Sequence, residues 1–409
     1  MGYVYEAVPE EVGLSSKHLK YIDSVMERAI REKVMKGMVT LVARHGKIAQ
    51  WKAYGEADQD VPMEKDAIFR YASMSKPIGA AALMQLFDQG IVMPSDPIAD
   101  YIREFADVKV ATEQKDTTIA LEELKRPITV HDLLTMTAGL TCTQPKITDY
   151  PTTIYCSEQY RKADIVDTMH DLDCTLKDMV AKVTQMPVAS QPGERWDYSN
   201  LSSLVAGRIV EIVSSMDLRT YLKKYIFQPL EMKETDFFPP EKDWKRMPAV
   251  YACGSMERLD ALDVPGTDDT RLPFGEHRKF YNIAAGLHGT ALDYFRFAQM
   301  LCDQGRAGDG SRILSPNAVH MMTQNHIGSQ RTHLYGHGWG YMMNVQVDYN
   351  TVFNYMGTGS FGWHGYWGSV FNVWPEKDLV AIFLSQVSPV GPSWKIQERF
   401  LNVVANSVL

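Results

Sequence analysis

Hydrophobic residues follow two kinds of spacing along this chain, and the strand-like kind lies at the two ends. Near the start, residues 38–43 and 48–51 are apolar runs on either side of a His45-Gly46-Lys47 turn, which predicts a β-hairpin. From about residue 335 onward, runs rich in Val, Phe, Tyr and Trp are separated by turn residues, as is typical of strands. The strands predicted there are 335–347, 351–356, 361–374 and 378–386.

Helical spacing flanks these strands and fills the middle of the chain. Residues 16–33 carry apolar side chains three and four positions apart, and a similar segment closes the chain at 394–408. The stretch up to about residue 240 is mostly helical in pattern, and its clearest predicted helices are 77–90, 129–136, 175–185, 201–214 and 217–227.

The order of these elements predicts an α+β fold. Because strands lie at both ends and helices between them, the economical arrangement is one antiparallel sheet flanked by helices, with a mainly helical domain inserted into it. We expect a discontinuous sheet domain of residues 1–95 and 240–409 and a helical domain of residues 96–239.

The composition is that of a globular protein and narrows the possible partners. The formal net charge of −8 argues against nucleic acid, whose binding depends on basic patches. No apolar stretch is long enough to span a bilayer, and the first 30 residues lack the pattern of a signal peptide. The five cysteines are odd in number and lack CxxC spacing, which favours reduced thiols over disulfides. We therefore expect a cytoplasmic protein without a membrane partner.

The first candidate for chemistry is the pair Ser73 and Lys76, within YASMSKPIGA at residues 71–80. Residues three apart share one face of a helix, so a nucleophilic hydroxyl and a base could meet there. Pro77 is tolerated only in a first helical turn, so the helix should begin close to Ser73. The positive end of that helix should lower the pKa of Lys76. The motif alone is common, however, and a serine before a helix is also an ordinary N-cap.

Two further motifs follow in the chain. Residues 192–200 read PGERWDYSN, which places Tyr198 and Asn200 at the mouth of the predicted 201–214 helix. A phenol held near Lys76 could relay the proton of Ser73, and the Asn200 amide could bind Lys76 or a substrate carbonyl. An Asn cap beside a half-buried Tyr is the plain structural alternative.

The third motif lies in GSFGWHGYWGS at residues 359–369, within a strand pattern. Gly365 would allow a close approach of substrate or backbone. The main-chain N–H groups of Tyr366 and Ser73 could then form an oxyanion hole. The alternative is an aromatic core strand with a glycine bulge.

The order of S-x-x-K, Y-x-N and a glycine-containing strand motif resembles the serine β-lactamase and penicillin-binding-protein family. That family includes class C β-lactamases, DD-peptidases, family VIII carboxylesterases and related acyltransferases. Residues 128–140, 191–214, 226–237, 284–301 and 361–386 are also similar to recurrent family segments. The resemblance implies a β-lactamase/transpeptidase-like fold. It also implies that Ser73 is the acylated nucleophile, Lys76 its base and Tyr198 a partner in proton transfer, with Asn200 completing the second motif.

The chain departs from the lactamase pattern at the third motif. Family members of that kind carry Lys-Thr-Gly, or His in place of Lys, and the Lys helps to bind an anionic carboxylate. Here the positions hold Trp363, His364 and Gly365, and a Trp-led motif is similar to that of the carboxylesterase members. A strand histidine near an active site is more often structural than directly involved. This departure favours a neutral ester or amide as the small-molecule substrate.

The resulting prediction is a serine hydrolase that acts on carboxylic esters through an acyl-enzyme. Acyl transfer to another acceptor, amide hydrolysis of the β-lactamase or DD-peptidase kind, and a non-catalytic scaffold remain alternatives. No HExxH or Cys/His spacing indicates a metal, and no cofactor is expected. Residues 141–190 are loop-rich and contain aromatic side chains, so we expect them to shape the pocket entrance. The sequence leaves the oligomeric state open.

Overall fold

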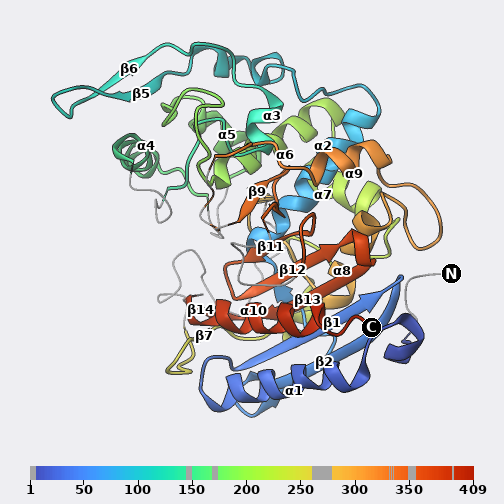
Figure 1. Cartoon of the computed structure of the whole chain (residues 1–409). Coiled ribbons are helices and arrows are strands. Elements are labelled where there is room, and N and C mark those ends of the chain that lie inside the picture. Colours follow the sequence, from blue (N-terminus) through green and yellow to red (C-terminus); the bar gives the residue numbers. More distant parts are fainter. Residues whose placement is uncertain are drawn as a thin grey trace.

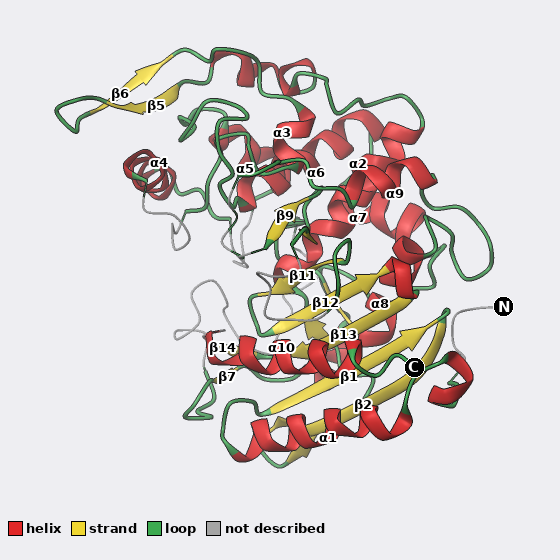
Figure 2. Ribbon diagram, in the orientation of Figure 1, coloured by secondary structure: helices red, strands yellow, loops and turns green. Residues whose placement is uncertain are grey.

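The computed structural model describes residues 6–143, 150–167, 174–259, 279–330, 332, 334, 336–348, 356–388 and 391–409. Its centre is an eight-stranded sheet of order β3-β2-β1-β13-β12-β11-β10-β9, in which every neighbouring pair is antiparallel. The strands are β1 (Gly37–Arg44), β2 (Lys47–Asp58), β3 (Val61–Pro62), β9 (His337–Trp339), β10 (Asn344–Gln346), β11 (Phe361–Gly365), β12 (Ser369–Trp374) and β13 (Leu379–Ser385). Figure 2 shows these strands in yellow.

The two ends of the chain meet in the middle of this sheet. Strand β1 pairs with β13 in a register that places Leu41 opposite Ile382. Every residue of β13 is buried, because both faces of the sheet are covered at this point. The predicted sheet built from both ends of the chain is therefore confirmed.

Helices cover both faces. Helices α1 (Ser16–Arg31) and α10 (Gly391–Ala405) lie on one face, where they share an apolar core with alternate residues of β13, such as Phe383. Helix α8 (Ala291–Cys302) covers the opposite face, toward which Ile382 points. This arrangement, visible in Figure 1, confirms an α+β fold with an antiparallel sheet flanked by helices.

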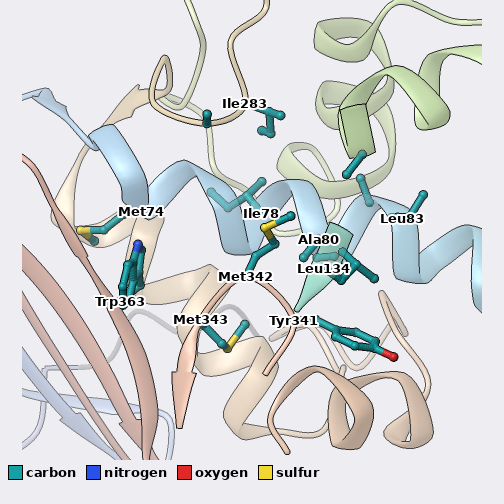
Figure 3. Packing of buried hydrophobic residues seen from close by; sticks show 14 of the residues in the cluster. Met74, Ile78, Ala80, Leu83, Leu134, Ile283, Tyr341, Met342, Met343 and Trp363 are labelled. Atoms are coloured by element: carbon teal, nitrogen blue, oxygen red, sulfur yellow. The ribbon is translucent and has the colours of Figure 1, made fainter. Parts of the chain in front are cut away.

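The helical part lies above the sheet in Figure 1 and surrounds helix α2 (Ser75–Asp88). Almost all of α2 is buried, including both its polar first turn and its apolar middle, so it is a central rather than a surface helix. Figure 3 shows its side chains in the large apolar core that also contains Leu134, Ile283 and Met342. The helices around it are α3 (Val130–Leu134), α5 (Leu176–Val183), α6 (Asn200–Ser214), α7 (Leu218–Leu222) and α9 (Pro316–Met322).

Several local features differ from the predicted elements or were not predicted. The stretch expected to be mostly helical contains a hairpin of β5 (Val110–Glu113) and β6 (Ile119–Glu122), which projects from the molecule in Figure 1. It also contains α4 (Pro151–Lys162), which the pattern did not predict. The predicted strand 335–347 divides into β9 and β10, since Met342 adopts a positive φ of 62° and the chain turns there. The predicted strand 351–356 lies outside the described residues except for Met356.

Short pairings complete the fold. Strand β4 (Phe69–Arg70) pairs with β8 (His288–Gly289), and β7 (Tyr251–Ala252) pairs with β14 (Val387–Ser388). The sheet and helical domain boundaries at residues 95 and 240 stay predictions. Within the described parts of the chain, no helix combines the length and the apolar character that a membrane crossing requires.

Candidate active site

Ser73 lies in a sharp turn between β4 and α2. The turn is a short 3-10 helix, Ala72–Met74, and α2 begins at Ser75. Ala72 has a φ of 49°, a left-handed conformation that is uncommon for a residue with a Cβ and that costs about 1–2 kcal/mol. Pro77 is the third residue of α2, so the prediction of a helix starting close to Ser73 is confirmed.

Hydrogen bonds between this strained turn and residues 287–294, which include β8 and the start of α8, hold the turn in place. The Tyr294 hydroxyl donates to the Met74 carbonyl at 2.8 Å, and the Tyr71 hydroxyl donates to the Thr290 carbonyl at 2.7 Å. The Leu287 N–H donates to the Ser75 hydroxyl at 3.1 Å. All these groups are buried, so the turn has little freedom to relax.

Lys76 lies directly against Ser73. Its Nζ donates to Ser73 Oγ at 3.0 Å and to the Ala284 carbonyl at 2.8 Å. Only 1% of Lys76 is exposed, and this burial lowers its pKa to about 7, although the neighbouring Cys142 and Asp167 oppose the shift. The expected lowering is confirmed, and burial is its main cause. An amine of this pKa is partly neutral at neutral pH and can accept a proton from the hydroxyl beside it.

Tyr198 lies on the other side of Lys76. The Lys76 ammonium is 4.9 Å from the centroid of the Tyr198 ring. The Trp363 Nε1–H donates to the Tyr198 hydroxyl at 3.3 Å. Burial raises the pKa of Tyr198, and hydrogen bonds from Ser73 and Trp363 oppose this shift in part. The phenol therefore remains protonated at neutral pH and can give a proton only while receiving another.

The strand carrying the third motif packs against the Ser73 turn. A Cβ on Gly365 would lie 2.6 Å from the Tyr71 carbonyl oxygen, so only glycine allows this close approach. Tyr366 follows at the end of β11, and its side chain is 44% exposed. The main chain at Tyr366 is thus held near the turn that carries Ser73.

Trp363 and His364 point to opposite faces of β11. Trp363 is only 3% exposed and packs edge-on against Trp339, with 4.5 Å between ring centroids. His364 Nδ1 makes a 2.8 Å hydrogen bond with the side-chain Oε1 of Gln397 on α10. Burial lowers the pKa of His364 to about 4, so the imidazole is neutral at physiological pH. The structure brings Trp363 to Tyr198 and directs His364 away from it.

Asn200 is the first residue of α6, and Ser199 rather than Asn200 caps the helix by accepting from the Ser202 N–H at 3.0 Å. The Asn200 N–H donates to the thiol of Cys142. Within the described residues, the buried Asn200 Oδ1 has no hydrogen-bond partner. It therefore remains available as an acceptor beside Tyr198.

Three groups near Lys76 were not predicted from the sequence. They are the Ala284 carbonyl, Cys142 and Asp167. Residues 284–301 resemble a segment that recurs in the family, but their sequence does not indicate that the Ala284 carbonyl contacts Lys76. Asp167 is one of many acidic residues and lies in residues 141–190, outside the segments that resemble the family, so it had no sequence signal. Among the residues the structure describes, no three His, Cys, Asp or Glu side chains gather in a way that could hold a metal ion.

Comparisons with known proteins agree with this fold. A family model described as Beta-lactamase matches residues 22–406. Protein Rv1367c of Mycobacterium tuberculosis is 30% identical over 369 residues, covering 87% of each chain, and Esterase EstB of Burkholderia gladioli is 28% identical over 385 residues, covering 91% of each. The solved structure of EstCE1, titled a hydrolase with promiscuous acyltransferase activity, superimposes with a TM-score of 0.78 at 24% identity and covers 95% of this chain and 99% of its own.

Proposed function

This chain belongs to the beta-lactamase family and is a serine hydrolase; on that premise we propose that it cleaves carboxylic esters through an acyl-enzyme on Ser73. The observation that carries the proposal is the contact between Lys76 and Ser73. A buried amine with a pKa of about 7 donates to the candidate nucleophile at 3.0 Å. A base of this strength suits the activation of a hydroxyl at neutral pH.

The proposed first half-reaction forms a bond between Ser73 Oγ and the carbonyl carbon of the ester. As it attacks, Ser73 gives its proton to neutral Lys76. The main-chain N–H groups of Ser73 and Tyr366 hold the negative oxygen of the tetrahedral intermediate. When the intermediate collapses, Tyr198 gives its proton to the departing alkoxide and regains one from Lys76. The alcohol leaves, and the acyl group remains on Ser73.

The second half-reaction returns the enzyme to its first state. Water attacks the acyl carbon and loses a proton to the Lys76–Tyr198 pair, which then reprotonates Ser73 Oγ. The free carboxylic acid leaves. The unpartnered Asn200 Oδ1 can accept a hydrogen bond from a substrate donor at the same end of the site.

The nature of the third motif supports a neutral substrate. Trp363 occupies the position where lactamase members carry a cation, and its only polar group already bonds to Tyr198. His364 is neutral and contacts Gln397, so it brings no positive charge to the site. The relative named Esterase EstB supports the ester over the β-lactam as substrate.

The test compares hydrolysis of a short p-nitrophenyl ester with that of a chromogenic cephalosporin, each with wild type and Ser73→Ala. We expect ester turnover that is lost in Ser73→Ala, with little cephalosporin turnover. Ester activity that survives in Ser73→Ala would rule out Ser73 as the nucleophile. Fast cephalosporin turnover would replace the esterase proposal by a β-lactamase one.

Acyl transfer shares every step up to the acyl-enzyme, so the same assay should include an alcohol acceptor. A transfer product that grows with acceptor concentration would favour an acyltransferase, and release of free acid alone would favour the hydrolase. A cytoplasmic location is also part of the proposal. It is supported by the five cysteines, all of which are free thiols.

A further inference from the structure

A buried carboxylate that the proposed mechanism does not use lies close to the site. Only 1% of Asp167 is exposed. Its two oxygens accept hydrogen bonds from Thr143, one from the main-chain N–H at 2.9 Å and one from the hydroxyl at 2.6 Å. Burying a carboxylate costs free energy unless it is hydrogen-bonded, so we asked what role the buried Asp167 side chain has.

The segment that Asp167 holds runs beside the segment that carries Tyr198. The Cys142 thiol donates to the Tyr198 carbonyl at 3.4 Å. Next to it, the Ser199 hydroxyl donates to the Thr141 carbonyl at 3.4 Å. Residues 141–143 therefore form a wall along the main chain of Tyr198, and Asp167 is bonded to the end of that wall.

Helix α4 holds the same two segments from the other side. The Ser157 hydroxyl donates to the Cys142 carbonyl at 2.7 Å, and the Thr153 hydroxyl donates to the carboxylate of Asp197 at 2.7 Å. The position of Tyr198 thus depends on a connected set of buried hydrogen bonds, of which the Asp167–Thr143 pair is one end.

Asp167 also acts on the active site through its charge. Lys76 donates to the Ser73 hydroxyl and to the Ala284 carbonyl, and its ammonium lies near the Tyr198 ring. The titratable groups that act on its pKa are the thiol of Cys142 and the carboxylate of Asp167. Burial raises the pKa of Cys142 far above neutrality, so this thiol is uncharged. Burial also raises the pKa of Asp167, but the hydrogen bonds from Thr143 and the nearby Lys76 oppose that shift. Asp167 is therefore the group among these that can carry a negative charge, which acts on both Lys76 and Tyr198.

We propose that Asp167 is a positioning residue of the active site, which fixes the wall beside Tyr198 through Thr143 and places a negative charge opposite Lys76. This inference rests on the proposed roles of Ser73 and Lys76. A negative charge keeps the neutral amine of Lys76 a stronger base than burial alone would leave it. The carboxylate thereby offsets part of the effect of burial on the base.

The test measures the rate at which a fluorophosphonate labels Ser73 as a function of pH, in the full-length protein. In this reaction Ser73 Oγ displaces fluoride from phosphorus and loses its proton to Lys76, so the rate reports the base without needing the natural substrate. The key variant is Asp167→Asn. Its amide can still accept from the Thr143 N–H and donate to the Thr143 hydroxyl, so it removes the charge and keeps the shape.

The labelling rate should rise with pH as Lys76 loses its proton, and we call this rise the acidic limb. We expect Asp167→Asn to shift the midpoint of the acidic limb to lower pH by about half a unit or more, and to lower the rate at high pH. Thr143→Val removes one hydrogen bond and keeps the charge, so its limb should stay in place. Asp293→Asn is the matched control, because Asp293 is a buried carboxylate on α8 that also accepts from a main-chain N–H and a threonine hydroxyl. Its limb should also stay in place.

The outcomes separate this inference from the proposed function. A wild-type protein that is not labelled at Ser73 would contradict the proposed function itself. A labelled wild type with the same limb in Asp167→Asn would overturn the role of Asp167 alone. Should Asp167→Asn fail to fold in a thermal melt, Asp167→Ser must show the same downward shift, and an unshifted limb in that variant would overturn the inference equally.

Discussion

The indole N–H of Trp363 donates a hydrogen bond to the phenol oxygen of Tyr198 at 3.3 Å. An indole nitrogen can donate but not accept, so this contact uses a lone pair of the phenol oxygen and not the phenol proton. A lysine at this position would supply the same hydrogen bond together with a positive charge. Trp363 thus contacts the phenol without bringing a charge to it.

Replacing Trp363 by Phe should test this contact. The ring still fills the space beside Trp339, but the hydrogen bond to Tyr198 is lost, so the phenol loses part of its orientation. We expect kcat for a p-nitrophenyl ester to fall about tenfold with KM nearly unchanged, since one hydrogen bond acting in the transition state is worth about 1–2 kcal/mol. Steady-state kinetics would measure both constants.

A matched control for this variant is Trp394→Phe, because Trp394 is a partly exposed tryptophan that has a ring contact with His364 rather than with Tyr198. Its kcat should stay close to that of wild type. If Trp363→Phe raised KM and left kcat intact, Trp363 would serve binding rather than proton transfer.

The pH dependence of the reaction should follow Lys76. The amine accepts a proton only when it is neutral, and its folded pKa lies near 7 because burial disfavours the ammonium. Activity is therefore low below this pKa and rises as the pH increases through it. We expect kcat/KM for a neutral ester to show an acidic limb with a midpoint at about pH 7.

A pH-rate profile with an ester whose own groups do not ionise would measure this midpoint. The profile should be matched by the fluorophosphonate labelling rate, which reports the same base. A limb near the ordinary carboxylate range, with no transition close to neutral pH, would show that a group other than Lys76 takes the proton.

The close approach of β11 to the nucleophile turn predicts that Gly365 cannot be replaced. A Cβ at this position meets the Tyr71 carbonyl at 2.6 Å, and that carbonyl belongs to rigid backbone. Gly365→Ala must push β11 away from Ser73, so the oxyanion donors separate. We expect at least a hundredfold loss of kcat, or about 3 kcal/mol, together with a lower Tm.

Gly359→Ala offers the comparison, since it lies in the turn before β11 and its added Cβ would have no atom within 4 Å. Its φ of 83° makes the change costly for the backbone alone. This variant should lose stability yet keep its kcat. Equal losses of kcat in both variants would show that strain, and not the approach to Tyr71, controls the activity.

Much of the fold could be predicted because its cause is local in the sequence. The β1–β2 hairpin, the strand that begins at Leu379 and helix α3 all follow from apolar alternation, turn residues or helical spacing. The β5–β6 hairpin could not be predicted, because its strands are short and depend on a distant contact. The Ala111 N–H donates to the Val188 carbonyl, 77 positions further along the chain.

In the candidate site too, features with a local cause could be predicted, whereas features that depend on long-range contacts could not. Ser73 and Lys76 stand three residues apart, so helical geometry alone indicates their contact. The lowering of the Lys76 pKa was expected from the helix terminus, whereas its main cause is burial by segments far away in the sequence. Asp167 reaches the site through Thr143 and a fold of the chain that no spacing in the sequence reveals. Chemistry that depends on long-range burial is therefore visible only in three dimensions.

The last prediction concerns His364, the one histidine of the third motif. Burial lowers the pKa of His364 to about 4, although the hydrogen bond with Gln397 opposes this shift, so the imidazole carries no charge at physiological pH and its ring packs against α10. His364→Asn keeps a polar group that can meet Gln397, and we expect kcat/KM within about threefold of wild type, with the acidic limb still near pH 7. The variant should lose about 1 kcal/mol of stability, which a denaturant melt would measure, because the smaller side chain fills less space. Gln397→Ala should lose a similar amount, since both changes break the same contact. A loss of activity approaching that of Ser73→Ala, or a displaced limb, would instead place His364 in the proton path, and the assignment of Lys76 as the base would then have to be revised.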